Sequence, residues 1–131
     1  MGGRLIPGAL AAMLGLMASA GAASAQADGA SLFQQNCSAC HQAQGQGVKG
    51  AFPALAGDAF VQGDKHAVAS LLLHGRGGMP NFSADLSDAE IAAILTYVRS
   101  SFGNHAPPVD VATVGAARRI PETAPSALAT H

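Results

Sequence analysis

The sequence predicts an all-α fold with three main helices joined by long loops. Apolar residues recur at helical spacing after Ser87, and no segment shows the apolar–polar alternation of a half-buried strand. The residues between Gln42 and Gly57 are rich in glycine and include Pro53, which is typical of a loop. Long loops are uncommon in a compact domain unless they enclose something, so they favour a large buried cofactor.

The first 25 residues have the composition of a secretory signal peptide. Arg4 is their only charge, an apolar stretch of small residues follows, and Ala23-Ser24-Ala25 matches the A-x-A pattern of a cleavage site. We therefore expect cleavage before Gln26 and export to the periplasm. The alternative is an uncleaved leader that tethers the protein to a membrane; no second segment approaches spanning length, so the mature chain is expected to have no membrane span.

The exported chain is mildly acidic and poor in large side chains. Without Arg4 it carries six lysines and arginines against eight aspartates and glutamates. No basic stripe is present, so nucleic acid is not an expected partner. A core of Ala, Leu and Val with five Phe and no Trp is thin for a domain of this size, which also favours a large apolar cofactor.

Two of the three predicted helices lie in the first part of the domain. One runs over residues 29–36, directly before the cysteines, and turns Phe33 inward. The next runs over about 65–73, with Asp64 as its N-terminal cap and Gly75 as its terminator.

The third helix has the clearest signals. Ser87 can cap its N-terminus, and Glu90 three residues later completes a capping box. Gly103 is placed to end it. Between them lies an apolar stripe at helical spacing: Ile91, Ile94, Leu95, Val98 and Phe102.

The composition changes after Asn104, where Pro, Ala and Thr become frequent. We interpret residues 26–104 as the domain and 105–131 as a peripheral Pro/Ala-rich C-terminal tail. This tail is expected to carry one short helix, from Asp110 to Arg118, and then to be disordered.

Both cysteines belong to one motif, Cys37-Ser38-Ala39-Cys40-His41. C-x-x-C-H is the attachment signal for haem c. Two thiols at this spacing can both reach the vinyl groups on one edge of a porphyrin and form thioethers, and the histidine that follows can bind the iron.

Two other interpretations of the cysteine pair compete with haem. A thioredoxin-like redox motif would follow a strand in a βαβ pattern, but the residues before Cys37 look helical. A zinc site needs four ligands, and the chain has no second cysteine pair. The motif therefore favours haem attachment, and a haem-free thiol–disulfide protein is the main alternative.

Met79 offers a second axial ligand for such a haem. It is the only methionine outside the leader, and it lies in the glycine-rich segment GRGGMPNF, where Pro80 stiffens the turn. Its flexible thioether can reach an iron from the side opposite His41. The alternatives are that Met79 only packs against the core, and that His74, at a helix end, replaces it as a ligand in an altered state.

These motifs together resemble the class I c-type cytochromes, small electron carriers with one haem, over about residues 28–104. The first helix matches through CSACH at its end and through Gly29 and Phe33 before it. The last helix matches through Ile94 and Tyr97, and the loops match through FPALAG and GGMP.

The resemblance implies a cytochrome c fold around one covalently bound haem c. By resemblance, Cys37 and Cys40 are the thioether anchors, and His41 and Met79 are the axial ligands of the iron. The Pro53 carbonyl would accept a hydrogen bond from the second ring nitrogen of His41 and so orient it. The resemblance further implies an electron-transfer protein and not an enzyme.

More narrowly, the layout is similar to haem proteins that accept electrons from periplasmic dehydrogenases or form their cytochrome subunits. This implies redox protein partners, namely a periplasmic dehydrogenase and a terminal acceptor. The chain lacks the lysine-rich rim of the mitochondrial type, so an oxidase docked by lysines is not expected. The alternatives are a haem enzyme or sensor with a displaceable Met79, and a subunit fixed in a dehydrogenase complex.

Overall fold

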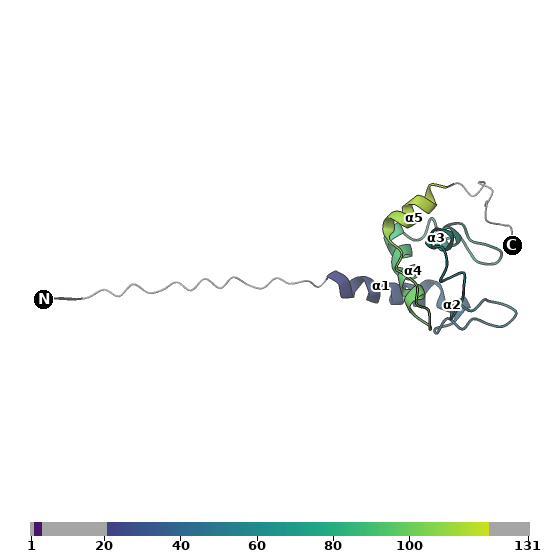
Figure 1. Cartoon of the computed structure of the whole chain (residues 1–131), viewed down its shortest axis with the longest axis horizontal. Coiled ribbons are helices and arrows are strands. Elements are labelled where there is room, and N and C mark those ends of the chain that lie inside the picture. Colours follow the sequence, from purple (N-terminus) through teal and green to yellow (C-terminus); the bar gives the residue numbers. More distant parts are fainter. Residues whose placement is uncertain (1, 4–20, 121–131) are drawn as a thin grey trace.

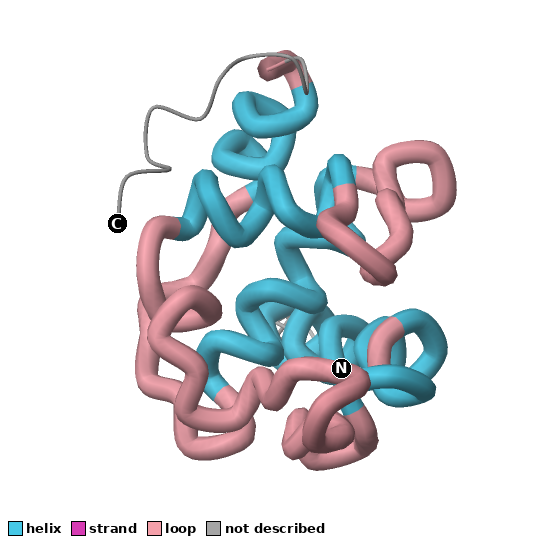
Figure 2. Tube along the Cα trace, turned by 90° about the vertical axis from the view of Figure 1, so that its right-hand side faces the viewer, coloured by secondary structure: helices cyan, strands magenta, loops and turns pink. Residues whose placement is uncertain are grey.

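The computed structural model describes residues 2–3 and 21–120. These residues form helices α1 (Gly21–Asn36), α2 (Ser38–His41), α3 (Lys65–His74), α4 (Asp88–Ser100) and α5 (Val111–Arg118). Within the described ranges the only strand-like pairings are two isolated bridges, and long loops connect the helices around the outside (Figure 2). The predicted all-α fold class is therefore confirmed.

Local capping sets the start of two predicted helices. Asp64 accepts hydrogen bonds from the backbone N–H groups of His66 and Ala67, so α3 begins where the sequence predicts. Ser87 and Glu90 form both halves of the capping box at the start of α4.

The C-terminal end of α4 differs from the prediction. The helix ends at Ser100, before the expected terminator Gly103. Phe102 and Gly103 both have positive φ angles, 59° and 80°, so the chain turns away sharply. The Asn104 side chain then donates to the Val98 carbonyl at 2.9 Å. This hydrogen bond replaces the one that the carbonyl would accept from a backbone N–H group if the helix continued.

Helix α4 is the centre of the molecule and packs against α1, α3 and α5 (Figure 1). At its crossing with α1, a Cβ added to Gly29 would overlap the backbone carbonyl of Ala93, so the absence of a side chain lets the helices approach. The ring of Phe33 on α1 packs at centroid distances of 5.7 Å from Tyr97 and 5.3 Å from Phe102. A small residue and an aromatic cluster together fix this crossing.

One hydrophobic core joins all the main helices. Phe33 and Ile91 are fully buried at its centre. The remaining buried apolar residues are Val61, Val68, Ala69, Leu72, Leu73, Leu86, Ala92, Ile94, Leu95, Val98, Val109, Val114 and Ala117.

The segment after Asn104 contains the predicted short helix, but it is not peripheral as predicted. Helix α5 contacts α3 and α4, and Val109, Val114 and Ala117 belong to the core. The Thr96 hydroxyl also exchanges hydrogen bonds with the backbone of Val109, at 3.0 and 3.2 Å. A few buried side chains therefore hold this segment against the core, although its Pro/Ala-rich composition predicted a peripheral tail.

The predicted signal peptide lies mostly outside the described residues. So does most of the segment after Arg118 that was predicted to be disordered. Helix α1 begins at Gly21, so it spans the expected cleavage point before Gln26. Of the helices that the structure describes, none has the length and apolar character needed to cross a membrane.

Candidate functional site

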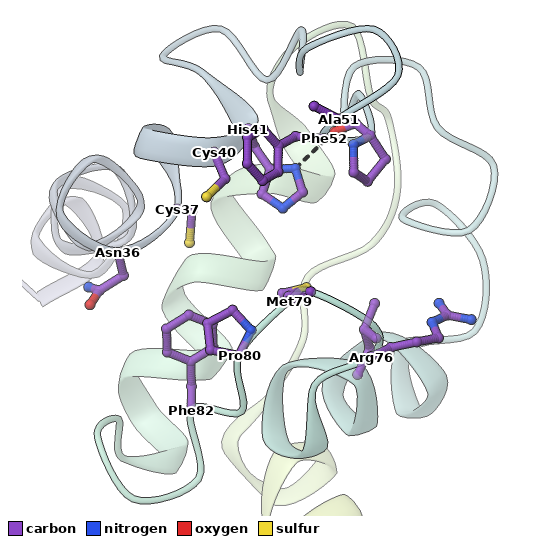
Figure 3. A pocket seen from close by; sticks show the side chains of 13 residues that line it. Asn36, Cys37, Cys40, His41, Ala51, Phe52, Arg76, Met79, Pro80 and Phe82 are labelled. Carbon is purple, nitrogen blue, oxygen red and sulfur yellow. Dashed lines mark hydrogen bonds between the residues drawn. The ribbon is translucent and has the colours of Figure 1, made fainter.

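A hollow opens between α2, the loop around Pro53 and the loop that carries Met79 (Figure 3). It comprises two adjoining spaces of about 260 and 200 Å³. The inner space reaches the core residues Phe33, Ile94 and Val98. The two spaces share six lining residues: Cys37, His41, Pro53, Leu71, Arg76 and Met79.

Helical geometry turns the C-x-x-C-H motif toward this hollow. The Cys37 N–H donates to the Phe33 carbonyl at 2.8 Å, so the chain continues from α1 into α2 almost without a break. Positions i, i+3 and i+4 of a helix lie on one face. Cys37, Cys40 and His41 have this spacing, and all three line the hollow.

The two cysteines are partly buried and are not joined in a disulfide. Burial, and to a lesser degree the neighbouring Cys40, raise the pKa of Cys37 to about 11. Redox-active C-x-x-C motifs instead lower a cysteine pKa so that a thiolate is available at neutral pH. This environment therefore disfavours the thiol–disulfide alternative.

His41 is buried, and its orientation is set by Pro53. Its Nδ1 lies 2.9 Å from the Pro53 carbonyl oxygen. Because a carbonyl can only accept, Nδ1 is the protonated nitrogen, and Nε2 keeps a free lone pair. Figure 3 shows that second nitrogen directed into the hollow, toward Met79.

The loop that brings Pro53 to His41 depends on Gly47. The Gly47 N–H donates to the His41 carbonyl at 2.9 Å, and its φ angle is +64°. A Cβ at this position would lie 2.5 Å from the Phe52 carbonyl oxygen. Glycine is therefore needed both for the backbone conformation and for the close approach of the two loop arms.

Met79 faces His41 across the hollow, at the tip of a small hairpin (Figure 3). Backbone hydrogen bonds of 3.0 and 3.3 Å link Met79 and Arg76 in both directions. Gly75, with φ +71°, ends α3 and lets the chain fold back, since a Cβ there would lie 2.6 Å from the Met79 carbonyl oxygen. The glycines before Met79 thus allow the tight hairpin.

His74, the other candidate ligand, lies aside from this arrangement, whereas Arg76 lies in its lining. His74 is not among the residues that line the hollow, and its buried Nε2 has no hydrogen-bond partner within the described part of the chain. The Arg76 guanidinium lies 5.2 Å from the centroid of the Phe60 ring.

The donor set fits haem c better than a bare metal ion. Two thiols lie on one side, an imidazole nitrogen and a thioether face each other, and most of the other lining side chains are apolar. Among the described residues, no group of three or more His, Cys, Asp or Glu side chains could hold a metal ion, which disfavours the zinc alternative.

Sequence reasoning missed several lining residues, among them Phe52, Leu71 and Phe82. Phe82 is the last residue of the GRGGMPNF segment, so its place in the lining could have been predicted from the sequence. Leu71 lies on α3, and only the packing of that helix brings it to the hollow.

The family described as "Cytochrome C oxidase, cbb3-type, subunit III" matches residues 24–98, more than half of the chain. The chain belongs to this cytochrome c family. Its resemblance to the class I c-type cytochromes is thereby confirmed, and covalently bound haem c is its cofactor. The protein is a haem electron carrier in the general sense that this family shares.

Individual relatives match over different shares of their length. Cytochrome c-552 of Thermus thermophilus is 39% identical over 100 residues, covering 64% of this chain and 66% of that protein. The cytochrome c subunit of alcohol dehydrogenase (quinone) from Gluconobacter oxydans is 34% identical over 91 residues, covering 60% of this chain and 19% of that subunit. The solved structure of cytochrome c6 from the diatom Phaeodactylum tricornutum is 30% identical, covering 70% of this chain and 97% of that one with a TM-score of 0.48.

The chain thus spans somewhat less than two thirds of the Thermus protein's length and about a fifth of the dehydrogenase subunit's.

Proposed function

We propose that this protein is an exported single-electron carrier with His41 and Met79 as the axial ligands of one haem c. Cys37 and Cys40 would anchor the haem through thioethers. The observation that carries the proposal is the convergence of these four side chains, from two distant segments, on one largely apolar hollow.

When bound, the haem iron supplies one-electron chemistry by cycling between its ferrous and ferric states. The chain's own residues tune and confine that chemistry. Pro53 holds His41 with Nε2 free to bind, and Met79, on the far side of the hollow, would supply the second ligand and leave no position for a substrate. Met/His ligation raises the reduction potential, and apolar walls raise it further by disfavouring the extra positive charge of the ferric state.

We infer that the carrier passes electrons from a periplasmic dehydrogenase or respiratory donor to a terminal acceptor. Support comes from the dehydrogenase cytochrome subunit among its relatives. Near the hollow, Val48 and Phe52 are 42% and 41% exposed, which suits weak, transient docking. Export to the periplasm rests on the leader sequence.

The second candidate is a cytochrome subunit fixed in a dehydrogenase complex. The same relative favours it, because there the similar region is one part of a larger subunit. Gentle purification of the native protein distinguishes the two. A free carrier elutes alone, whereas a fixed subunit elutes in constant ratio with a dehydrogenase.

The central test is spectroscopic. Expressed with a cytochrome c maturation system, the wild type should keep its haem after denaturation and show a Met–iron charge-transfer band when oxidised. Met79→Ala should abolish this band and lower the reduction potential, because the soft thioether sulfur that favours ferrous iron is lost.

His74→Ala is the matched control, since His74 is the other ligand considered, and it should keep the band. A band that persists in Met79→Ala would refute the ligand assignment, and a wild type without covalent haem would refute the whole proposal. A high-spin wild type that binds small ligands would favour the enzyme or sensor alternative.

A further inference from the structure

Helix α5 lies beyond the residues that match the family, yet its last residue reaches back to the Met79 side of the molecule. The Arg118 guanidinium donates from Nε to Asp88 Oδ1 at 2.6 Å. It also donates from Nη1 to the Ser83 carbonyl at 2.5 Å and from Nη2 to the Leu86 carbonyl at 3.0 Å. One side chain thus holds three acceptors, all of them more than 29 residues away in the sequence.

The two carbonyls belong to a turn that begins where the Met79 loop ends. The N–H groups of Asp85 and Leu86 both donate to the Phe82 carbonyl, at 3.2 and 3.0 Å. Phe82 also lines the hollow, and its own N–H donates to the Leu72 carbonyl of α3 at 2.9 Å. The turn 82–86 therefore fixes the C-terminal end of the loop that carries Met79.

Arg118 is suited to fasten this turn. Its planar guanidinium presents several donors in a fixed geometry, which lysine cannot reproduce. The side chains of Arg118 and Asp88 are only 32% and 31% exposed, so water weakens these bonds less than at an open surface. Helix α5 is itself fixed to the core through Val114 and Ala117, so the turn is tied to a firm support.

We infer that Arg118 is a positioning residue for Met79: by fastening the turn 82–86 to α5, it keeps the Met79 loop closed over the hollow. This inference rests on the proposed role of Met79 as a ligand. Helix α5 thereby contributes to the redox site. Without the contacts of Arg118, the C-terminal end of the Met79 loop would be less fixed, and the loop would open more often and release the Met79 thioether.

The test measures how readily an added ligand displaces Met79. Imidazole is titrated into the oxidised holoprotein, and loss of the Met–iron charge-transfer band reports displacement. The apparent affinity for imidazole scales with the fraction of molecules in which the loop is open. Arg118→Ala should therefore bind imidazole about tenfold more tightly than the wild type, equivalent to about 1.4 kcal/mol, and Arg118→Lys should lie between them.

Arg119→Ala is the matched control. Arg119 is the next residue, is exposed, and makes no side-chain hydrogen bond or ion pair within the described part of the chain, but its loss changes the charge equally. It should bind imidazole as the wild type does.

Equal imidazole affinities in Arg118→Ala and Arg119→Ala would overturn the inference and leave the proposed function intact. Failure of both Arg118 variants to fold, seen by circular dichroism, with Arg119→Ala unaffected, would assign Arg118 a general stabilising role and would also overturn it. A wild type that lacks the charge-transfer band would instead refute the proposed function.

Discussion

Asn104 shows how a single buried residue holds two parts of the molecule together. Its side chain is fully buried and makes three hydrogen bonds to backbone groups. Nδ2 donates to the carbonyls of Leu55 and Val98 at 3.0 and 2.9 Å, and Oδ1 accepts from the Gly57 N–H at 2.8 Å. It therefore ties the loop that follows Pro53 to the end of α4.

Replacing Asn104 by Ala should lower the free energy of unfolding by about 3 kcal/mol, because buried backbone groups lose their partners. Denaturant unfolding followed by circular dichroism measures this change. Asn81→Ala is the control, since Asn81 is exposed and bonds only within its own turn, and it should cost much less. Equal losses in the two variants would contradict the role given to Asn104.

At the scale of elements, the start of α5 is linked to α3 by charge. Asp110 caps α5 by accepting from the Thr113 N–H at 2.8 Å, and it pairs with Lys65 at the start of α3, also at 2.8 Å. The hydrogen bond from Lys65, followed by those from Thr113, holds the pKa of Asp110 well below its usual range. The ionised form is thus favoured by folding.

A pKa that is lower in the folded state means stability that is present above the unfolded value of about 4 and lost as the pH falls below it. Asp110→Asn keeps a capping side chain but cannot ionise. We therefore expect it to be less stable than the wild type at pH 7 and to lose less stability on acidification. Thermal unfolding across this pH range measures both effects.

Asp85→Asn provides the control for Asp110, because Asp85 is exposed and its side chain has no hydrogen bond within the described residues. Its stability should follow the pH as the wild type's does. If Asp110→Asn did the same, the pairing with Lys65 would not contribute.

At the scale of the whole molecule, the crossing of α1 and α4 sets the frame around the hollow. Gly29→Ala would place a methyl group against the Ala93 backbone carbonyl, which cannot move away without shifting α4. Alanine favours a helix by about 1 kcal/mol over glycine, but overpacking costs about 1–3 kcal/mol and here involves backbone. We expect a net loss of stability, seen as a lower Tm of the holoprotein.

Gly115→Ala on α5 is the matched comparison. There the added Cβ would meet the end of the Asp88 side chain at 3.1 Å, and a side-chain carboxylate, even one paired with Arg118, can shift more easily than helix backbone. It should cost less than Gly29→Ala. The reverse order would show that the helix crossing is not tightly packed.

The sequence was most informative where partners are neighbours in the chain. The caps Asp64 and Ser87 bond to N–H groups two or three residues away, so the starts of α3 and α4 were predictable. The end of α4 was not, because the side chain that satisfies it also depends on a distant loop at Leu55. The composition of the C-terminal segment led to the wrong prediction that α5 is peripheral. Its packing depends on a few buried side chains, whereas prolines and alanines are the most frequent residues of the segment.

The sequence alone points to the proposed haem attachment, because the spacing of Cys37, Cys40 and His41 is local and one helical turn places all three on one face. The surroundings of that motif depend on how distant parts of the chain pack together. The tertiary structure buried α5 in the core, brought Leu71 of α3 to the hollow, and gave Arg118 partners 30 to 35 residues away. Such contacts follow from how helices pack, and no local pattern encodes them.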